Sequence, residues 1–518
     1  MFQDGWVEQV AATGGRPRIG LHGVTEADGF VQRLDSAPTV TAMVSQDRRT
    51  EFGTVVAPAG ESEPPPYNRA MFLLGTQRVN EAGHLEIGGC DAVRLAERFG
   101  TPLYVVDETA IREACRAYRH AFESRYPTVT VAYASKAFLV PAMARLIDEE
   151  GFDLDVASGG ELHVGLASGF PPQRIVFHGN NKGDDEIARA LDAGVGRIVI
   201  DNAWEAVRVD EAAQTRRRVQ EVWVRVAPGV DPHTHRRIRT GQQDTKFGFN
   251  ISSGAALDAV VDIVRRPGLL FTGLHAHIGS NLRDMEAHLG AIEALLDLAA
   301  AIREETGLSV EELNVGGGLG IRYLPDDQVP SIDAFADRIV GALLEGLASR
   351  HLPLPHLHLE PGRSIVGEGG TTLYRVGSTK VVPIEEAPGH RAYVAIDGGL
   401  SDNPRPQLYD AVYHATLANR VTETPAGTYR IAGKHCETDT LIDAVPLPEP
   451  RPGDLLAVPS TGAYGHAMAS NYNRLGRAPV VFVRDGHVRL AARRETLDDL
   501  LRLDVLPDDP AASPIALA

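Results

Sequence analysis

Lys136 is the side chain whose place in the sequence most favours covalent chemistry. It follows residues 129–135, an apolar run with the composition of a buried strand. A lysine where the first strand of a barrel meets its loop is placed to form a Schiff base with an aldehyde cofactor, and we expect burial to lower its pKa. A lone lysine of this kind is more often a solvated loop residue. The assignment therefore depends on the residues at the ends of the other strands.

A glycine run and an arginine indicate a phosphate site. Gly316, Gly317 and Gly318 end the apolar stretch 312–316, and Arg363 lies in the next loop of the same type. In barrel enzymes a phosphate group commonly lies at the loops after strands seven and eight, where only glycine lets the backbone N–H groups approach closely. A glycine run alone is most often a tight turn, but this position favours phosphate.

Glu360 ends the otherwise apolar run 356–359 and directs a carboxylate toward the same rim. A structural pair with Arg363 is an equally good interpretation of this residue taken alone. A lysine, a phosphate site and a carboxylate together match the aldehyde, phosphate and ring nitrogen of pyridoxal 5'-phosphate. A carboxylate at the ring nitrogen would keep the pyridinium protonated.

His275 and His277 end another strand-like run, and alternation puts both on one face. An imidazole at the rim could stack on a flat cofactor. The pair could instead ligate a metal, but no further His, Cys or Asp set lies at convincing spacing, so zinc ranks behind stacking and simple core packing. We expect no metal.

Cys436 is the residue of the C-terminal part that could transfer a proton. Its neighbours His435 and Glu437 make a polar setting, in which a thiol can donate a proton, although a free cysteine is usually a small buried hydrophobe. Three further polar residues lie in glycine- or proline-marked loops and would singly be surface residues: Arg405, Tyr409 and Tyr464.

The elements that must position these residues follow a regular alternation. With the strand before Lys136, eight strand-like runs alternate with helix-period segments, which predicts an α/β fold containing a (β/α)8 TIM barrel. The seven later runs lie near 153–157, 174–178, 197–201, 222–227, 271–277, 312–316 and 356–360, and the helical segments include 138–150, 183–193, 202–214 and 284–305. Beyond Arg363 strand-like runs dominate and predict a mostly β domain, at 372–382, 391–396, 428–433, 454–458 and 479–484.

The domain boundaries follow from these patterns. Residues 1–70 lack sustained periodicity and form an N-terminal extension, so Met71 is a candidate start of the functional chain. Residues 71–107 hold short strands that need a sheet to pair with, and we expect them to join the β domain. The barrel then covers 108–365 and the C-terminal β domain 366–518.

Composition narrows the class of protein. The 518 residues are 43% hydrophobic and 23% charged, and 51 basic against 69 acidic residues give a net charge of −18, which argues against binding nucleic acid or an anionic membrane surface. Three scattered cysteines form no disulfide framework, and no signal peptide or membrane span is visible. We expect a cytoplasmic protein that acts on small molecules.

From about Met71 to Leu506 the chain resembles the diaminopimelate decarboxylase family, whose members have the alanine-racemase-type (fold type III) pyridoxal-phosphate fold. Eight stretches occur in the family's order and carry the resemblance: Tyr133–Ala137, Asp155–Leu162, His178–Lys182, His277–Ser280, Gly316–Gly318, Glu360–Arg363, Cys436–Glu437 and Gly462–Tyr464. So many ordered motifs are specific for the fold and the cofactor.

The resemblance implies decarboxylation of meso-2,6-diaminopimelate to L-lysine and CO2, the last step of lysine biosynthesis. It makes Lys136 the cofactor lysine, His277 the ring-stacking residue and Glu360 the partner of the pyridine nitrogen. Other cofactor contacts would come from Asp155, Ser280, Gly316, Gly317, Gly318, Gly362, Arg363 and Tyr464. The substrate's distal end would meet Arg363, Arg405, Tyr409, Glu437 and Tyr464.

The resemblance also implies a homodimer, in which Cys436 donates a proton into the neighbour's barrel. Two arginines near the distal end suit a second carboxylate, which a guanidinium grips in a bidentate fork. One departure concerns the cysteine loop, because the family usually continues Cys-Glu-Ser-Gly-Asp whereas residues 438–440 read Thr-Asp-Thr. The family pattern therefore does not predict the backbone conformation of this loop.

Three alternatives remain. An amino-acid racemase of the same fold would place arginine at the pyridine nitrogen, and Glu360 argues against it. A decarboxylase for carboxynorspermidine, D-lysine or ornithine would keep the same catalytic set and differ only in the distal pocket. A non-catalytic homologue would be free to lose Lys136 or Cys436, and this chain keeps both.

Overall fold

A closed barrel of eight parallel strands forms the centre of the structure, a computed structural model that describes residues 71–230, 242, 244–384 and 388–506. The proposed extension 1–70 lies outside the described residues. Around the barrel the order is β5-β6-β7-β8-β9-β11-β12-β13, closed by pairing of β13 with β5. Their bounds are β5 (Val129–Ala134), β6 (Asp153–Val156), β7 (Ile175–Phe177), β8 (Arg197–Ile200), β9 (Gln220–Ala227), β11 (Leu269–His275), β12 (Glu312–Asn314) and β13 (His356–Leu359).

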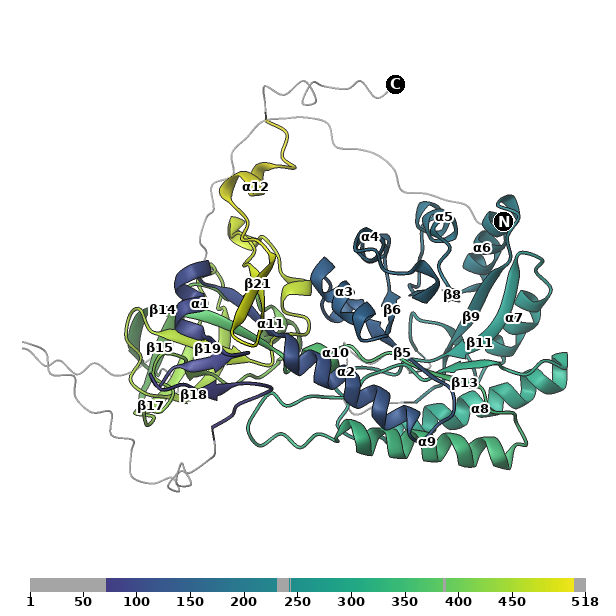
Figure 1. Ribbon diagram of the computed structural model, residues 1–518, viewed down its shortest axis with the longest axis horizontal. Helices are drawn as coiled ribbons and strands as arrows, with labels where there is room; N and C mark the ends of the chain where they lie inside the picture. Colours follow the sequence, from purple (N-terminus) through teal and green to yellow (C-terminus); the bar gives the residue numbers. More distant parts are fainter. Residues whose placement is uncertain (1–70, 231–241, 243, 385–387, 507–518) are drawn as a thin grey trace, which may run out of the picture. The chain divides into compact units, whose positions relative to one another are not determined.

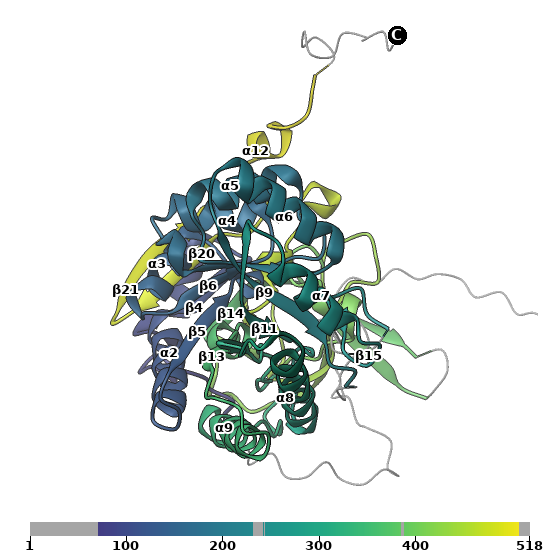
Figure 2. The same cartoon turned by 90° about the vertical axis from the view of Figure 1, so that its right-hand side faces the viewer.

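Helices surround the barrel, as Figure 2 shows, and bury its outer face. The bounds are α2 (Glu108–Glu123), α3 (Pro141–Glu149), α4 (Gly159–Ala167), α5 (Asp184–Ala193), α6 (Ala203–Thr215), α7 (Ala255–Val264), α8 (Glu286–Thr306) and α9 (Ile332–Ser349). Polar side chains cap several N-termini: Ser158, Asn202 and Ser331 each accept a backbone N–H of the first turn of α4, α6 and α9. The predicted barrel is thus confirmed, with strand and helix ends within about three residues of those expected from periodicity.

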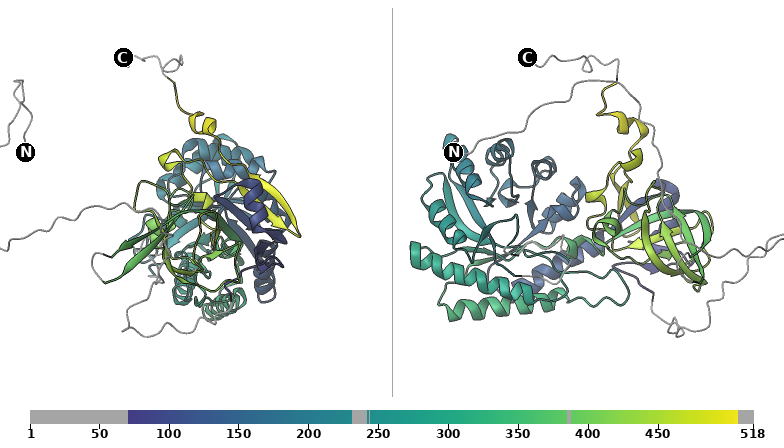
Figure 3. Two further views of the ribbon diagram at one scale, coloured as in Figure 1. Left: turned by 90° about the vertical axis from the view of Figure 1, so that its left-hand side faces the viewer. Right: turned by 180° about the vertical axis from the view of Figure 1, so that it is seen from behind.

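Most strands after the barrel belong to one antiparallel-rich sheet, seen in Figures 1 and 3, so the expected mostly β C-terminal region is confirmed. Its order is β18-β17-β15-β14-β4-β20-β21, and β19 pairs with β14 and β16. The strands are β4 (Leu103–Asp107), β14 (Gly370–Pro383), β15 (His390–Ile396), β16 (Thr416–Leu417), β17 (Gly427–Ala432), β18 (Thr440–Leu447), β19 (Leu455–Pro459), β20 (Val480–Arg484) and β21 (His487–Ala492). Because β4 lies between β14 and β20, the chain before the barrel contributes a central strand to this sheet.

The remaining elements are short. The strands β1 (Arg78–Val79), β2 (Leu85–Ile87) and β3 (Cys90–Asp91) form a separate antiparallel sheet beside α1 (Ala92–Phe99). A further strand, β10 (Phe249–Asn250), extends β9 in parallel. Three short helices complete the set: α10 (Arg363–Val366), α11 (Arg405–Tyr409) and α12 (Leu497–Leu501).

The floor of the barrel, at the amino ends of its strands, contains a closed polar cluster. Glu312 accepts hydrogen bonds from Arg197 Nη2 at 2.7 Å and Nε at 3.0 Å, and from Trp223 Nε1 at 2.6 Å. His358 Nε2 lies 3.5 Å from the same carboxylate. Burial acts to raise the pKa of Glu312, but the nearby His358 ring and the hydrogen bonds from Arg197 and Trp223 hold it below its usual range.

Candidate active site

A cavity of about 310 Å³ opens at the opposite end of the barrel, where the strands finish. Its position matches the face that carries active sites in TIM-barrel enzymes. Eight residues expected from the sequence line it: Lys136, His277, Ser280, Glu360, Arg363, Arg405, Tyr409 and Tyr464. Cys436 and Glu437 do not line it, and both are exposed on the surface of the β region. The cavity therefore brings these eight residues together without the cysteine. Asp155, Gly316, Gly317, Gly318 and Gly362 are also absent from its lining.

Lys136 lies in the 3-10 turn Ser135–Ala137 directly after β5, and its side chain is exposed into the cavity. Loss of bulk water acts to lower the pKa of Lys136, but the Asp155 carboxylate, with Tyr464 and Glu360, outweighs it and raises the pKa. The expectation of a lowered pKa was wrong, because it considered burial and omitted the carboxylates across the barrel. The amine is held as a cation until a ligand changes its surroundings.

We call the end of the barrel where the strands finish and the cavity opens the mouth. Glu360 is the most tightly held carboxylate there. Its Oε1 accepts hydrogen bonds from His178 Nε2 at 2.7 Å and Asn314 Nδ2 at 2.8 Å, and its Oε2 accepts one from His275 Nε2 at 3.0 Å. Burial acts to raise the pKa of Glu360, but the bonds from His178 and His275 keep it well below its usual range. The carboxylate is thus ionised, and Oε2, with one bond from the described residues, can accept another.

The two histidines of β11 and its loop have separate positions. His275 is fully buried behind Glu360, and burial lowers its pKa to about 4. His277 lines the cavity, and its Nδ1 accepts the Gly317 N–H at 3.3 Å, which leaves the ring proton on Nε2. Burial, with the nearby Lys136 charge, holds the pKa of His277 well below 6.5. His275 is thus the deeper of the two histidines, and both are neutral at pH 7.

His178, His275 and Glu360 also lie within 4.8 Å of one another, a spacing that could hold a metal ion. Sequence spacing did not show this set, because His178 follows β7 and Glu360 follows β13. Each histidine Nε2 donates to the carboxylate, so the hydrogen bonds account for the cluster as it stands. We assign it to holding Glu360 in place.

Two further charged residues, Arg225 and Asp155, lie at the mouth. Arg225 lines the cavity from β9, with Nε 3.8 Å from Asp201 Oδ1 and its guanidinium 4.2 Å above the Phe247 ring. Asp155 is buried at the end of β6, and burial raises its pKa. The signal for Arg225 was present, since it is the one charge inside the apolar run 222–227. His178 and Asn314 lie at strand ends like Glu360, and neither was assigned a role from the sequence.

Arg363 and Arg405 are buried guanidinium groups held by hydroxyls. Arg363 donates to Ser280 Oγ at 3.1 and 3.0 Å and to Tyr323 Oη at 2.5 Å. Arg405 donates to Tyr323 Oη at 3.0 Å and Tyr413 Oη at 2.6 Å. Within the described residues no carboxylate pairs with either arginine. A buried cation without a counter-charge is costly, so the pair is suited to an anionic ligand.

The glycine run after β12 is compact enough to exclude side chains. A Cβ on Gly316 would lie 2.6 Å from the Ala276 carbonyl oxygen, and one on Gly318 the same distance from that of Gly279; both have positive φ. Among the described residues, the Gly318 amide N–H has no acceptor. With Lys136, ionised Glu360 and two arginines without carboxylate partners, these groups fit pyridoxal 5'-phosphate.

The cysteine loop has a defined structure in spite of its departure from the family pattern. Asp439 is buried, and its carboxylate accepts the Leu400 N–H at 2.8 Å and the His435 Nδ1–H at 2.5 Å. The Cys436 N–H donates to Asn473 Oδ1 at 3.1 Å. Asp439 thus ties the loop to residues 397–402, and Cys436 is presented on the surface.

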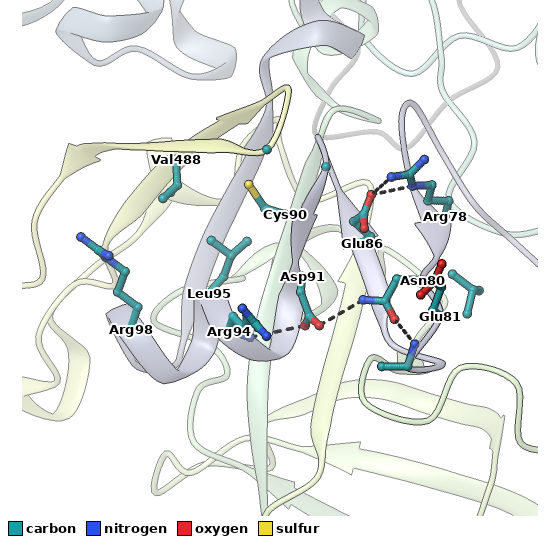
Figure 4. Close-up of a pocket in the computed structure, with 14 residues that line it drawn as sticks. Arg78, Asn80, Glu81, Glu86, Cys90, Asp91, Arg94, Leu95, Arg98 and Val488 are labelled. Carbon is teal, nitrogen blue, oxygen red and sulfur yellow. Dashed lines mark hydrogen bonds and ion pairs between the residues drawn. The ribbon is translucent and has the colours of Figure 1, made fainter.

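A larger groove, of about 790 Å³, lies away from the mouth, beside β1–β3 and α1 (Figure 4). Two of its carboxylates are already engaged: Glu86 accepts from Arg78, and Asp91 accepts from Asn80 and caps α1. It lacks a lysine or a histidine in its lining. Size therefore does not identify the site here, and the smaller cavity at the mouth holds the convergent groups.

Comparisons with known proteins all indicate the same family. Residues 108–367 match the pyridoxal binding domain of pyridoxal-dependent decarboxylases, so the cofactor is pyridoxal phosphate. The chain is 46% identical to the diaminopimelate decarboxylase of Bacillus subtilis (strain 168) over 84% of this chain and 98% of that protein. It is 44% identical to that of Mycobacterium tuberculosis (strain H37Rv), over 82% and 96%.

Solved structures agree. The diaminopimelate decarboxylase of M. jannaschii in complex with L-lysine has a TM-score of 0.77 and 35% identity, covering 83% of this chain and 98% of that one. The Helicobacter pylori enzyme with L-lysine has a TM-score of 0.72 and 30% identity, covering 80% and 99%. This chain therefore belongs to the diaminopimelate decarboxylase family.

Proposed function

We propose that this protein decarboxylates meso-2,6-diaminopimelate to L-lysine and CO2, the last step of lysine biosynthesis. The observation that carries this substrate is the pair Arg363 and Arg405, which lines the cavity beside Lys136 and has no carboxylate partner among the described residues. A carboxylate far from the reacting carbon would supply the missing negative charge in a bidentate geometry. Ornithine and lysine, decarboxylated to diamines, have no second carboxylate for this pair.

Each chemical group of the cofactor has a candidate partner in the protein. Lys136 would hold the aldehyde, His277 would stack on the ring, and Glu360 would hold a proton at the ring nitrogen. Gly316, Gly317, Gly318, Ser280, Gly362 and Tyr464 would surround the phosphate, with Asp155 beside Lys136. When bound, pyridoxal phosphate supplies an electron sink for the pair left by departing CO2.

The protein's own groups then have separable tasks. Glu360, kept ionised by His178 and His275, holds the ring-nitrogen proton. Arg363 and Arg405, together with Tyr409 and Tyr464, would bind the distal end and thereby orient the bond that breaks. Glu437 does not line the cavity of its own chain, so it would reach the distal end only from a second copy of the chain. The Cys436 thiol would deliver a proton to the α carbon.

Because Cys436 does not line the cavity of its own chain, we propose a homodimer in which each cysteine completes the partner's site. Mixing the variants Lys136→Ala and Cys436→Ala, neither of which has a complete site, tests this. A mixed dimer would contain one site with both wild-type residues, so random re-association should restore about a quarter of wild-type activity. Absence of any recovery under exchange would exclude a shared site.

The substrate itself is tested by CO2 release from protein loaded with pyridoxal phosphate. Release from meso-diaminopimelate with formation of L-lysine, and none from L-lysine, L-ornithine or D-lysine, is the expected result. Release from one of the others would keep the fold and the cofactor and replace the substrate. No release from any would favour a non-catalytic homologue.

The proposal also includes the domain boundaries and the location of the protein in the cell. We propose 71–107 as a segment of the β domain, 108–365 as the barrel and 366–518 as the C-terminal domain, which limited proteolysis can test. We also propose a cytoplasmic location, which cell fractionation can test. Within the described residues, no helix is long and apolar enough to cross a bilayer.

A further inference from the structure

A single phenol oxygen connects the two arginines of the cavity. Tyr323 Oη accepts a hydrogen bond from Arg363 Nη1 at 2.5 Å and another from Arg405 Nη1 at 3.0 Å. Tyr323 follows the glycine run of β12 and is 3% exposed, whereas Arg363 begins α10 and Arg405 begins α11. Residues from three separate parts of the chain therefore meet at one atom.

Further neutral groups restrict both guanidinium groups. Ser280 Oγ accepts from Arg363, and Tyr413 Oη accepts from Arg405 at 2.6 Å. The Arg405 guanidinium lies 5.0 Å from the Tyr323 ring centroid, and the Tyr323 and Tyr413 rings meet edge to face at 5.3 Å. The two cations thus have little freedom to separate.

The chemistry of the bridge decides what the pair can bind. Two guanidinium groups repel each other, and a carboxylate between them would hold them together but cancel their charge. A phenol oxygen accepts from both and leaves both charges available. Tyr323 does not line the cavity, so any effect on a ligand acts through the arginines.

We propose that Tyr323 is a positioning residue that holds Arg363 and Arg405 as one carboxylate-binding unit, and so sets the preference for ligands with a distal carboxylate. The inference rests on the proposed function, in which these arginines bind the distal end. It assigns the selectivity to a residue outside the cavity. Fixing donors by neighbouring hydrogen bonds lowers the cost of ordering them when a ligand binds.

Calorimetric binding to the protein loaded with pyridoxal phosphate tests this without turnover. The two probes are L-lysine, which keeps the distal carboxylate, and cadaverine, which lacks it. In Tyr323→Phe we expect the affinity for L-lysine to fall about tenfold while that for cadaverine stays within about twofold, because one hydrogen-bonded bridge is lost. An equal fall for both probes, or no fall for either, would overturn the proposal.

The matched control is Tyr126→Phe, since the buried Tyr126 hydroxyl donates to the Pro355 carbonyl oxygen and lies outside the cavity lining. It should leave both affinities unchanged. Tyr323→Met repeats the test with a different apolar side chain. If both Tyr323 variants are unfolded at the assay temperature, the residue is structural and the proposal fails. If the wild-type protein itself does not prefer L-lysine to cadaverine, the proposed distal-carboxylate site fails first.

Discussion

The two ends of the barrel each contain a buried glutamate, and these glutamates are held by different kinds of side chain. At the floor, Glu312 is bound in two places by the Arg197 guanidinium, so the charge is neutralised within the chain. At the mouth, Glu360 is held by the His178 and His275 rings and the Asn314 amide, with no arginine or lysine bonded to it among the described residues, and keeps its charge. The floor is a completed ion pair, whereas the mouth holds charges that a ligand must complete.

The same contrast separates the two His-x-His pairs of the sequence. His275 and His277 end β11 and face the mouth, whereas His356 and His358 begin and continue β13 and stack on each other near the floor at 4.4 Å. The residue pattern is identical in both. The position along the strand therefore decides between chemistry and packing, since TIM-barrel sites form at the carboxyl ends of the strands.

The largest effect is expected at the mouth, from Lys136→Ala. The variant should lose decarboxylase activity completely, because it removes the amine that would hold the cofactor aldehyde. Borohydride reduction of the wild-type protein should fix the cofactor to residue 136, which mass spectrometry detects. A cofactor still fixed to the variant would remove Lys136 from its role.

Cys436→Ala should reduce kcat by about a hundredfold or more, the usual contribution of a general acid, without preventing cofactor binding. The absorbance of the bound cofactor checks the second point. The buried Cys115, on α2, offers a control as Cys115→Ala. Unchanged kcat in Cys436→Ala would mean that another group protonates the product.

A smaller effect is expected on the pH dependence of stability. Burial lowers the pKa of His275 to about 4 in the folded protein, against 6.5 for an ordinary histidine. Between pH 6.5 and 4 the unfolded chain takes up a proton here that the folded chain does not, so the free energy of unfolding falls as pH falls, by up to about 1.4 kcal/mol per pH unit.

The variant His275→Asn should flatten this part of the curve, which denaturant titrations at pH 6.5, 5.5 and 4.5 would measure. The exposed His351 gives the control, as His351→Asn. An unchanged slope in His275→Asn would mean that His275 is charged in the folded protein. In that case a charged group of the chain itself would neutralise Glu360, as Arg197 neutralises Glu312 at the floor.

The barrel could be predicted because its strands are buried on both faces and alternate with amphipathic helices. The same pattern places Lys136, Glu360 and Arg363 at strand ends, and parallel strand ends meet at one rim. The cavity expected there is present. The periodicity of the sequence therefore predicts at which end of the barrel each residue lies.

Interactions that depend on tertiary distance could not be predicted. Tyr323 lies 40 residues from Arg363 and 82 from Arg405, and only the folded chain brings them to one oxygen. The direction of the Lys136 pKa shift depends on how near Asp155 lies, which sequence spacing does not give. Asp439, in the loop that departs from the family pattern, could not be assigned a partner for the same reason.

The most direct test of the contrast between mouth and floor compares Glu360→Gln with Glu312→Gln, measuring kcat and the free energy of unfolding for both. Glu360→Gln should reduce kcat by about a hundredfold or more. Glu312→Gln should leave kcat within about twofold and lower the free energy of unfolding by about 2 kcal/mol, since among the described residues it leaves Arg197 with only the more exposed Glu221 carboxylate as a partner. A large fall in kcat for Glu312→Gln, or unchanged kcat for Glu360→Gln, would contradict the division of the barrel into a chemical mouth and a structural floor.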